Sequence, residues 1–251
     1  MTERSPGGTH PGGPFPTTLW TQIRQCHDAS DPQYRSQLET LCNRYWPPVY
    51  FYIRRNWNRD PEVAKDLCQS FFLKFLEPGF LLKADMDKGR FRSFVCSCLQ
   101  NFLRNEHRDA HRQKRRPESG PILSIDQIQQ EYESFDLPDP NPDSAPPEAT
   151  FDRLWKRAIV QHAIARLREL GEQTDRSSQI EVFIRYRLDV GESSRPSRPQ
   201  LAKDLELTLA QVNYALQWVQ QEFIQILEAE VRDQVSSEED FESEMQLLFC
   251  D

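Results

Sequence analysis

The sequence predicts an all-α protein made of two small helical domains joined by an acidic, proline-rich linker. Apolar residues recur at helical spacing in most of the segments that carry them. The chain has only nine glycines and no glycine-rich loop, which argues against nucleotide-binding α/β folds. Its 251 residues suffice for one or two domains of roughly 100–200 residues each.

The first domain is expected over residues 17–116, after a Gly/Pro/Thr-rich leader at 1–16 that reads as disordered. A first helix begins near Thr17 or Thr18, either of which can serve as its N-cap. The apolar residues of 34–45 recur with helical spacing and predict a second helix, which Pro47 and Pro48 are expected to interrupt.

Two further helices complete this domain. Asp60 followed by Pro61 is a strong helix start, because Asp is a preferred N-cap and Pro suits the first helical position. The helix carries an apolar stripe and ends before Pro78-Gly79. From Phe91 onward another stripe predicts a helix with a buried front half and a basic back half, which extends through Arg116.

Residues 117–150 contain seven prolines and many acids, and are predicted to be a linker. The second domain is expected over 151–235, with helices near 151–167 and 180–188. A helix-turn-helix follows at 200–223, where Thr208 is the N-cap of the longer helix. The acidic C-terminal extension, 236–251, either docks on a basic surface and competes with DNA or extends the core of the second domain.

Charge is partitioned along the chain, although the formal net charge is −8. Residues 90–116 carry eight Lys or Arg and two acids, whereas 126–152 carry eight acids and no Lys or Arg. A basic segment inside an acidic protein indicates a nucleic-acid-binding surface, and the alternative is a solvated helix face.

Composition also restricts the location and the chemistry. No apolar run approaches the ~20 residues that cross a bilayer, and no signal peptide is visible. The six cysteines form no CxxC pair, which favours a reduced, cytoplasmic protein. His107 and His111 have metal-ligand spacing, but the arginines around them would repel a cation. No nucleophile or carboxylate pair stands out, so we expect neither an enzyme, a cofactor nor a metal site.

The segment 64–76, Ala-Lys-Asp-Leu-Cys-Gln-Ser-Phe-Phe-Leu-Lys-Phe-Leu, resembles region 2.2 of bacterial sigma factors, with the pattern A-x-D-L-x-Q-x-x-F-x-x-x-L. Residues 89–116 resemble regions 2.3 and 2.4, and the helix-turn-helix resembles region 4. Two such domains without a region 3 resemble the extracytoplasmic-function (ECF) group. The aromatic run at 45–50 and the extended C-terminus resemble the larger variants of planctomycete-type bacteria.

The resemblance implies a protein that binds the RNA polymerase core, selects promoter DNA and helps to open it. Asp66, Gln69 and Ser70 match the positions that face the polymerase clamp helices, although the family often has Glu in place of Ser70. An anti-sigma factor is a further candidate partner, and no membrane insertion is expected. The resemblance assigns the minus-ten DNA contacts to a basic and amide-rich set: Lys88, Arg90, Arg92, Ser93, Asn101, Arg104, Asn105, Arg108 and Arg112.

The helix-turn-helix departs from the family pattern, because no Lys or Arg occurs between Asp204 and Val231. Gln and Asn can read adenine edges, whereas phosphate contacts must come from Arg195, Arg198, Lys203 or the preceding helices. The residues expected to read bases are Ala210, Gln211, Asn213, Tyr214 and Gln217.

Two other functions stay open from the sequence. The first is a helix-turn-helix repressor or activator that is not a sigma subunit, and it would not need the polar face at Asp66 and Gln69. The second is a protein-interaction adaptor whose acidic linker and tail bind a basic partner.

Overall fold

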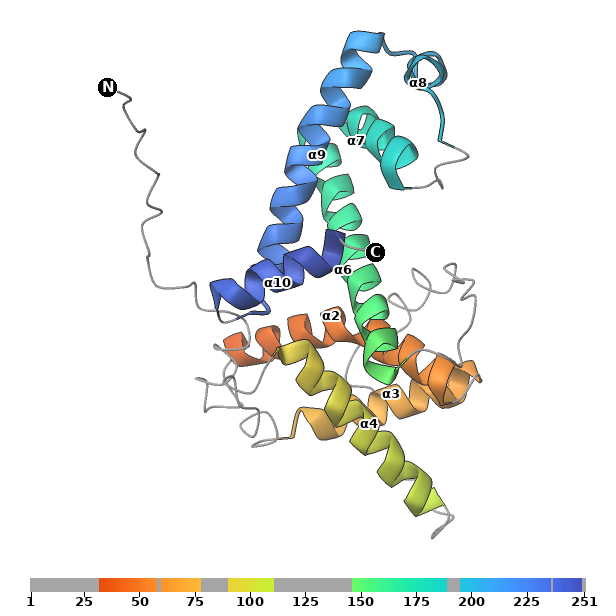
Figure 1. The fold of residues 1–251 in the computed structure, drawn as a ribbon, viewed down its shortest axis with the longest axis vertical. Coiled ribbons are helices and arrows are strands. Elements are labelled where there is room, and N and C mark those ends of the chain that lie inside the picture. The colour runs from red at the N-terminus through yellow and green to blue at the C-terminus, as the bar shows by residue number, and fades with distance from the viewer. Residues whose placement is uncertain are drawn as a thin grey trace, which may run out of the picture.

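The computed structural model describes residues 32–57, 60–77, 90–110, 146–188, 195–235 and 237–249. Every regular element in these ranges is a helix, which confirms the all-α prediction (Figure 1). The elements are α2 (Pro32–Asn56), α3 (Pro61–Phe75), α4 (Phe91–Ala110), α6 (Pro147–Thr174), α7 (Ser177–Phe183), the π-helical turn η3 (Ile184–Leu188), α8 (Arg198–Asp204), α9 (Leu209–Arg232) and α10 (Glu238–Phe249). None of these helices is long and apolar enough to cross a membrane.

Helix α2 continues through Pro47 and Pro48, so the expected interruption there is wrong. A proline inside a helix removes a hydrogen bond and costs roughly 3 kcal/mol. Both prolines are buried, and the flanking Trp46 and Val49 are 3% and 0% exposed. Since this stretch of α2 packs into the core, we attribute the continuity of the helix to tertiary packing that outweighs the proline penalty.

Helices α3 and α4 pack beside α2 and bury a cluster of aromatic rings. Asp60 caps α3 as expected: its carboxylate accepts a hydrogen bond from the Val63 amide at 3.0 Å. The ring of Phe71 lies 5.2 Å from that of Phe75 and 5.7 Å from that of Phe102 on α4. The apolar stripes of both helices therefore face the same core, as their spacing predicts.

Helix α6 connects the lower and upper parts of the molecule in Figure 1. Its 28 residues span about 42 Å. Near its start, Phe151 packs edge-on against Tyr52 of α2, and near its end Gly171 lies against Ser177 and Ile180 of α7. One continuous cluster of buried apolar residues runs from α2 to α10, so both halves share α6. The helix begins at Pro147, four residues before the expected start of the second domain at 151, and 117–145 lie outside the described residues.

The helix-turn-helix predicted from the sequence is formed by α8 and α9. Thr208 caps α9 in a reciprocal box: its hydroxyl accepts from the Gln211 amide, and the Gln211 side chain accepts from the Thr208 amide. Glu206 takes a left-handed backbone conformation in the turn, with φ 54°. These local interactions fix the start of α9 and present its first turns to solvent.

The C-terminal extension forms a helix, α10, which lies across the end of α9 beside the lower half of the molecule (Figure 1). Phe241 and Leu248 are buried on one face, and the guanidinium of Arg232 on α9 lies 3.8 Å from the centre of the Phe241 ring. The apolar spacing of the extension predicts that Phe241, Met245, Leu248 and Phe249 share one helical face, but Phe249 is 62% exposed. The extension is thus part of the apolar core.

Candidate nucleic-acid interface

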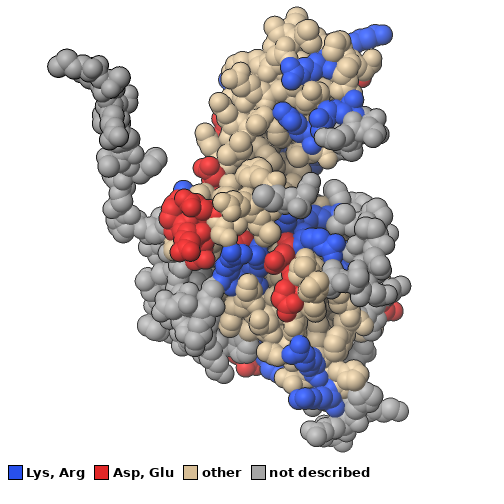
Figure 2. All heavy atoms as spheres, in the orientation of Figure 1, with Lys and Arg blue, Asp and Glu red and all other residues tan. Residues whose placement is uncertain are grey.

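Helix α4 presents an exposed polar stripe along its second half. Asn101, Arg104, Asn105 and Arg108 follow one another at i, i+3, i+4 and i+7, and all four are exposed. The opposite face is buried through Leu99, Phe102 and Leu103. Figure 2 shows the basic side chains of this end of α4 as blue spheres at the bottom of the view. Arginine can neutralise phosphate and asparagine can read a base edge, so this stripe has the chemistry of a DNA-binding face.

Arg104 is held in place within this stripe. One of its guanidinium nitrogens donates to the Asn101 side-chain oxygen and another donates to that of Gln100, each at 3.3 Å. Gln100 in turn donates to the Glu148 carboxylate at 3.0 Å. The hydrogen bond from Gln100 is the main cause that lowers the pKa of Glu148. The chain of contacts joins α4 to the start of α6.

The arginines at the start of α4 are less exposed than those at its end, because α10 packs over the start of the helix. Arg92 is 4% exposed and forms an ion pair with Glu244 at 2.6 Å, and with Asp152 at 3.0 Å. Its guanidinium also lies 4.8 Å from the centre of the Trp155 ring. Arg90 pairs with the same Glu244 at 3.3 Å and donates to the Ser243 hydroxyl. Of the expected minus-ten residues, these two therefore face protein in this structure.

Burial of the carboxyl group raises the pKa of Glu244, and the neighbouring guanidiniums of Arg92 and Arg90 oppose that rise. Asp152 behaves in the same way, since burial raises its pKa against the effect of Arg92. Of the other expected minus-ten residues, Ser93 is exposed, while Lys88 and Arg112 lie outside the described residues.

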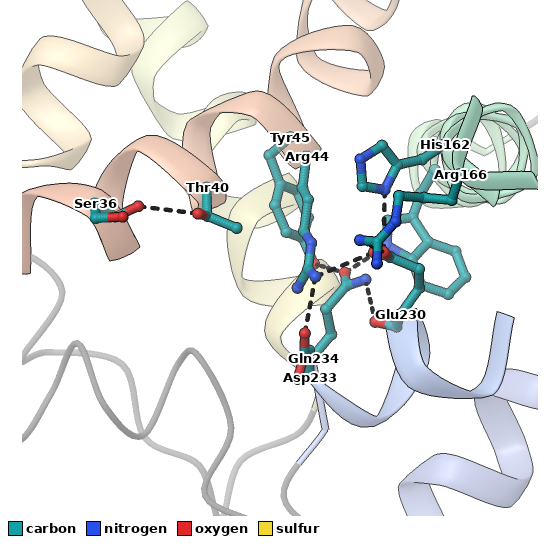
Figure 3. A network of polar contacts seen from close by, with 10 residues as sticks. Ser36, Thr40, Arg44, Tyr45, His162, Arg166, Glu230, Asp233 and Gln234 are labelled. Atoms are coloured by element: carbon teal, nitrogen blue, oxygen red, sulfur yellow. Dashed lines mark hydrogen bonds and ion pairs between the residues drawn. The ribbon is translucent and has the colours of Figure 1, made fainter. Parts of the chain in front are cut away.

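A buried polar network fixes the C-terminal end of α9 to α2 and α6 (Figure 3). The Gln234 side-chain oxygen accepts from the Tyr45 hydroxyl at 2.8 Å and from the Trp155 indole at 3.0 Å. Arg44 forms ion pairs with Glu230 at 3.1 Å and Asp233 at 2.9 Å. Because these contacts join α2, α6 and the end of α9 and lie away from the exposed stripes, the network holds the two halves in register.

Glu230 is the most connected acid of this network. Burial pushes its pKa upward, but the hydrogen bond with His162 and the charges of Arg44 and Arg166 outweigh that effect, so the pKa is lowered. The His162 ring nitrogen lies 3.2 Å from the carboxylate. A charged Glu230 therefore stabilises the fold.

The three residues of the expected polymerase face lie together on α3. Asp66 is exposed, and Gln69 and Ser70 are half-buried at i+3 and i+4 from it. On the opposite side of α3, Cys68, Phe71 and Phe75 are buried in the core. The structure thus places a continuous polar face beside the apolar stripe, as the spacing of the motif predicts.

The base-reading residues expected on the helix-turn-helix share an exposed surface. Ala210, Gln211, Asn213, Tyr214 and Gln217 are all exposed, as are Arg198 and Lys203 on α8. The amide oxygen of Gln211 is used in the helix cap, since it accepts from both the amide and the hydroxyl of Thr208. The ring of Tyr214 is 58% exposed at the start of α9.

The structure brings together two groups of residues that were not predicted from the sequence. The first consists of Glu244, Asp152 and Trp155 around Arg92, and the second is a set of arginines around Tyr186. No local pattern identifies the first group, because its members are far apart in the sequence. The arginine-rich composition of 185–198 was a signal for the second.

Cysteine and histidine chemistry does not add a site among the described residues. Cys42, Cys68, Cys96 and Cys98 are free, and burial raises the pKa of the Cys42 thiol to about 12 and that of Cys96 to about 11. Such thiols are poor nucleophiles. His107 packs edge-on against Trp57, and His111 lies outside the described residues. No group of three or more potential metal ligands occurs in the described ranges.

Comparison of the chain with family models, with curated proteins and with solved structures found no match.

Proposed function

We propose that the protein is a sigma factor of the ECF type, which binds the RNA polymerase core and directs promoter recognition and opening in the cytoplasm. One observation carries the proposal: the sigma-like motif of α3 presents a polar face on the same helical framework as an Asn/Arg stripe on α4 and a helix-turn-helix. A repressor or an adaptor needs only one of these surfaces.

Each surface has a separate task in this proposal. Asp66, Gln69 and Ser70 contact the polymerase core, and the α4 stripe engages the minus-ten element. Its arginines neutralise phosphates while its asparagines contact bases exposed by strand opening. The helix-turn-helix reads the upstream promoter element. The polymerase performs the chemistry, so the chain needs no catalytic residue.

The proposal is tested by competition for purified core polymerase between the labelled wild-type chain and unlabelled variants. The double variant Asp66→Ala/Gln69→Ala is expected to compete at least tenfold less well and to keep its helicity. A matched control is Glu242→Ala/Gln246→Ala, which also removes one acid and one amide, from exposed positions of α10. Equal competition by both double variants and the wild type would remove the polymerase face from the proposal.

A helix-turn-helix regulator that is not a sigma subunit is the second candidate, because the exposed residues of α9 could read DNA without polymerase. The same experiment separates the two functions. Sequence-specific DNA binding by a chain that does not bind core polymerase would favour the regulator.

A further inference from the structure

Three guanidinium groups gather around one tyrosine ring beside the helix-turn-helix. Arg187 of η3 lies 5.6 Å from the centre of the Tyr186 ring, and Arg195 and Arg198 each lie 5.5 Å from it. Since all three surround one ring, no two of these guanidinium carbons can be more than about 11 Å apart. All three arginines are exposed.

These arginines differ from several others in the described part of the chain. Arg44, Arg90, Arg92, Arg185 and Arg232 each form an ion pair with a carboxylate. No ion pair joins Arg187, Arg195 or Arg198 to a carboxylate of the described residues. The face of an aromatic ring attracts cations, which helps to hold the three groups together. It does not neutralise them, so the three guanidiniums keep their positive charges with no carboxylate partner among the described residues.

The chemistry of Tyr186 agrees with this description. A hydrogen bond with Arg198 is the main cause that lowers the pKa of the phenol, and the charges of Arg198, Arg187 and Arg195 act in the same direction. A positive potential that favours a phenolate also favours a bound anion. Figure 2 shows basic side chains gathered on this upper part of the molecule, on the side of α7 and α8.

A direct contact connects the cluster to the helix that would read DNA. One guanidinium nitrogen of Arg198 donates to the side-chain oxygen of Asn213 at 3.0 Å, and Asn213 is exposed on α9. Helix α9 itself carries no Lys or Arg until Arg232, at its C-terminal end. A nucleic acid that lies against the start of α9 therefore lies beside Arg198, which belongs to this cluster.

We infer that Arg187, Arg195 and Arg198, held around Tyr186, form a phosphate-binding clamp that anchors the backbone of duplex DNA while α9 faces its bases. The inference rests on the proposed function and supplies the anchoring that α9 lacks. Guanidinium groups bind phosphate oxygens in a bidentate manner. Phosphates follow one another at about 3.4 Å of axial rise per strand, so a cluster of this extent can reach more than one of them.

The clamp is tested by fluorescence anisotropy of a labelled DNA duplex titrated with the full-length chain between about 50 and 200 mM salt. The triple variant Arg187→Gln/Arg195→Gln/Arg198→Gln is expected to lower the slope of log affinity against log salt by two to three, since each lost phosphate contact lowers it by about one. Arg185→Gln is the matched control, because Arg185 lies on the same η3 segment but is paired with Glu181. The control is expected to keep the wild-type slope.

Two further variants separate charge from structure. The triple Lys variant at the same positions keeps the positive charge and is expected to retain most of the slope. The single variant Arg187→Gln is expected to lower the slope by about one. If the triple Gln variant loses helicity, the slope of this single variant tests the clamp instead. An unchanged slope in the single and triple Gln variants, or no binding of DNA by the wild-type chain, would overturn the clamp.

Failure of the clamp is distinguishable from failure of the proposed function. Only the clamp is refuted if the chain binds core polymerase and the salt slope of its DNA binding is the same with and without these arginines. A chain that binds DNA through the cluster but does not compete for polymerase refutes the sigma-factor assignment and leaves the clamp intact.

Discussion

Replacement of Glu244 by Gln is expected to destabilise the protein substantially. The side chain of Glu244 is 2% exposed and pairs with Arg92, which is 4% exposed, at 2.6 Å. The substitution leaves the guanidinium of Arg92 buried with Asp152 as its remaining carboxylate at 3.0 Å. Loss of one partner of a buried ion pair costs about 3–5 kcal/mol, and the remaining acid favours the lower end, near 3 kcal/mol.

In a protein of this size, a loss of about 1 kcal/mol lowers the melting temperature by about 2–4 °C, so we expect a decrease of about 6–12 °C. Circular dichroism melting curves and urea titrations of the full-length chain measure it. The control is Glu242→Gln, which makes the same chemical change at an exposed position of α10 and should stay within about 0.5 kcal/mol of the wild type. Equal melting temperatures for Glu244→Gln and the wild type would refute the argument that this buried pair holds α10 to α4.

Three other outcomes are expected. Arg104→Ala/Arg108→Ala should slow promoter opening more than it weakens polymerase binding, and should lower the salt slope of DNA binding by about two. Promoter opening at wild-type rates at every salt concentration would mean that the exposed stripe of α4 is only a solvated helix face. Deletion of 236–251 should lower the melting temperature and raise the affinity of the free chain for DNA, because it exposes the basic start of α4; unchanged or weaker DNA binding would contradict masking by α10. Glu230 has a lowered pKa in the folded state, so its stabilising effect is complete above about pH 4.5 and is lost as the pH falls through the folded pKa. Glu230→Gln should therefore reduce the loss of unfolding free energy on the acid side of a stability-against-pH curve. An unaltered curve would contradict that role.

Local signals in the sequence predicted local structure well. The N-caps at Asp60 and Thr208 are both confirmed, because each depends on contacts within four residues. The apolar stripes of α3 and α4 face the core as their spacing predicts. Pro47 and Pro48 show the opposite case, since their tolerance within α2 depends on packing against helices that are distant in the sequence.

The surroundings of the candidate DNA-binding residues could not be predicted from the sequence. Arg92 and Glu244 are separated by 152 positions, and only the folded chain places α10 over the start of α4. The cluster around Tyr186 joins η3 to the start of α8, across a segment whose conformation no periodic pattern predicts. The four arginines of 185–198 are visible in the sequence, but the convergence of three guanidiniums on one ring is not.

The most direct test of the sigma-factor assignment is transcription in vitro by purified core RNA polymerase on a library of genomic DNA from the source organism, with and without the chain. The account predicts that transcripts starting at discrete promoters appear only when the chain is added, and that Asp66→Ala/Gln69→Ala strongly reduces them. Identical transcripts with and without the chain, together with no stable complex between the chain and the core enzyme, would contradict it.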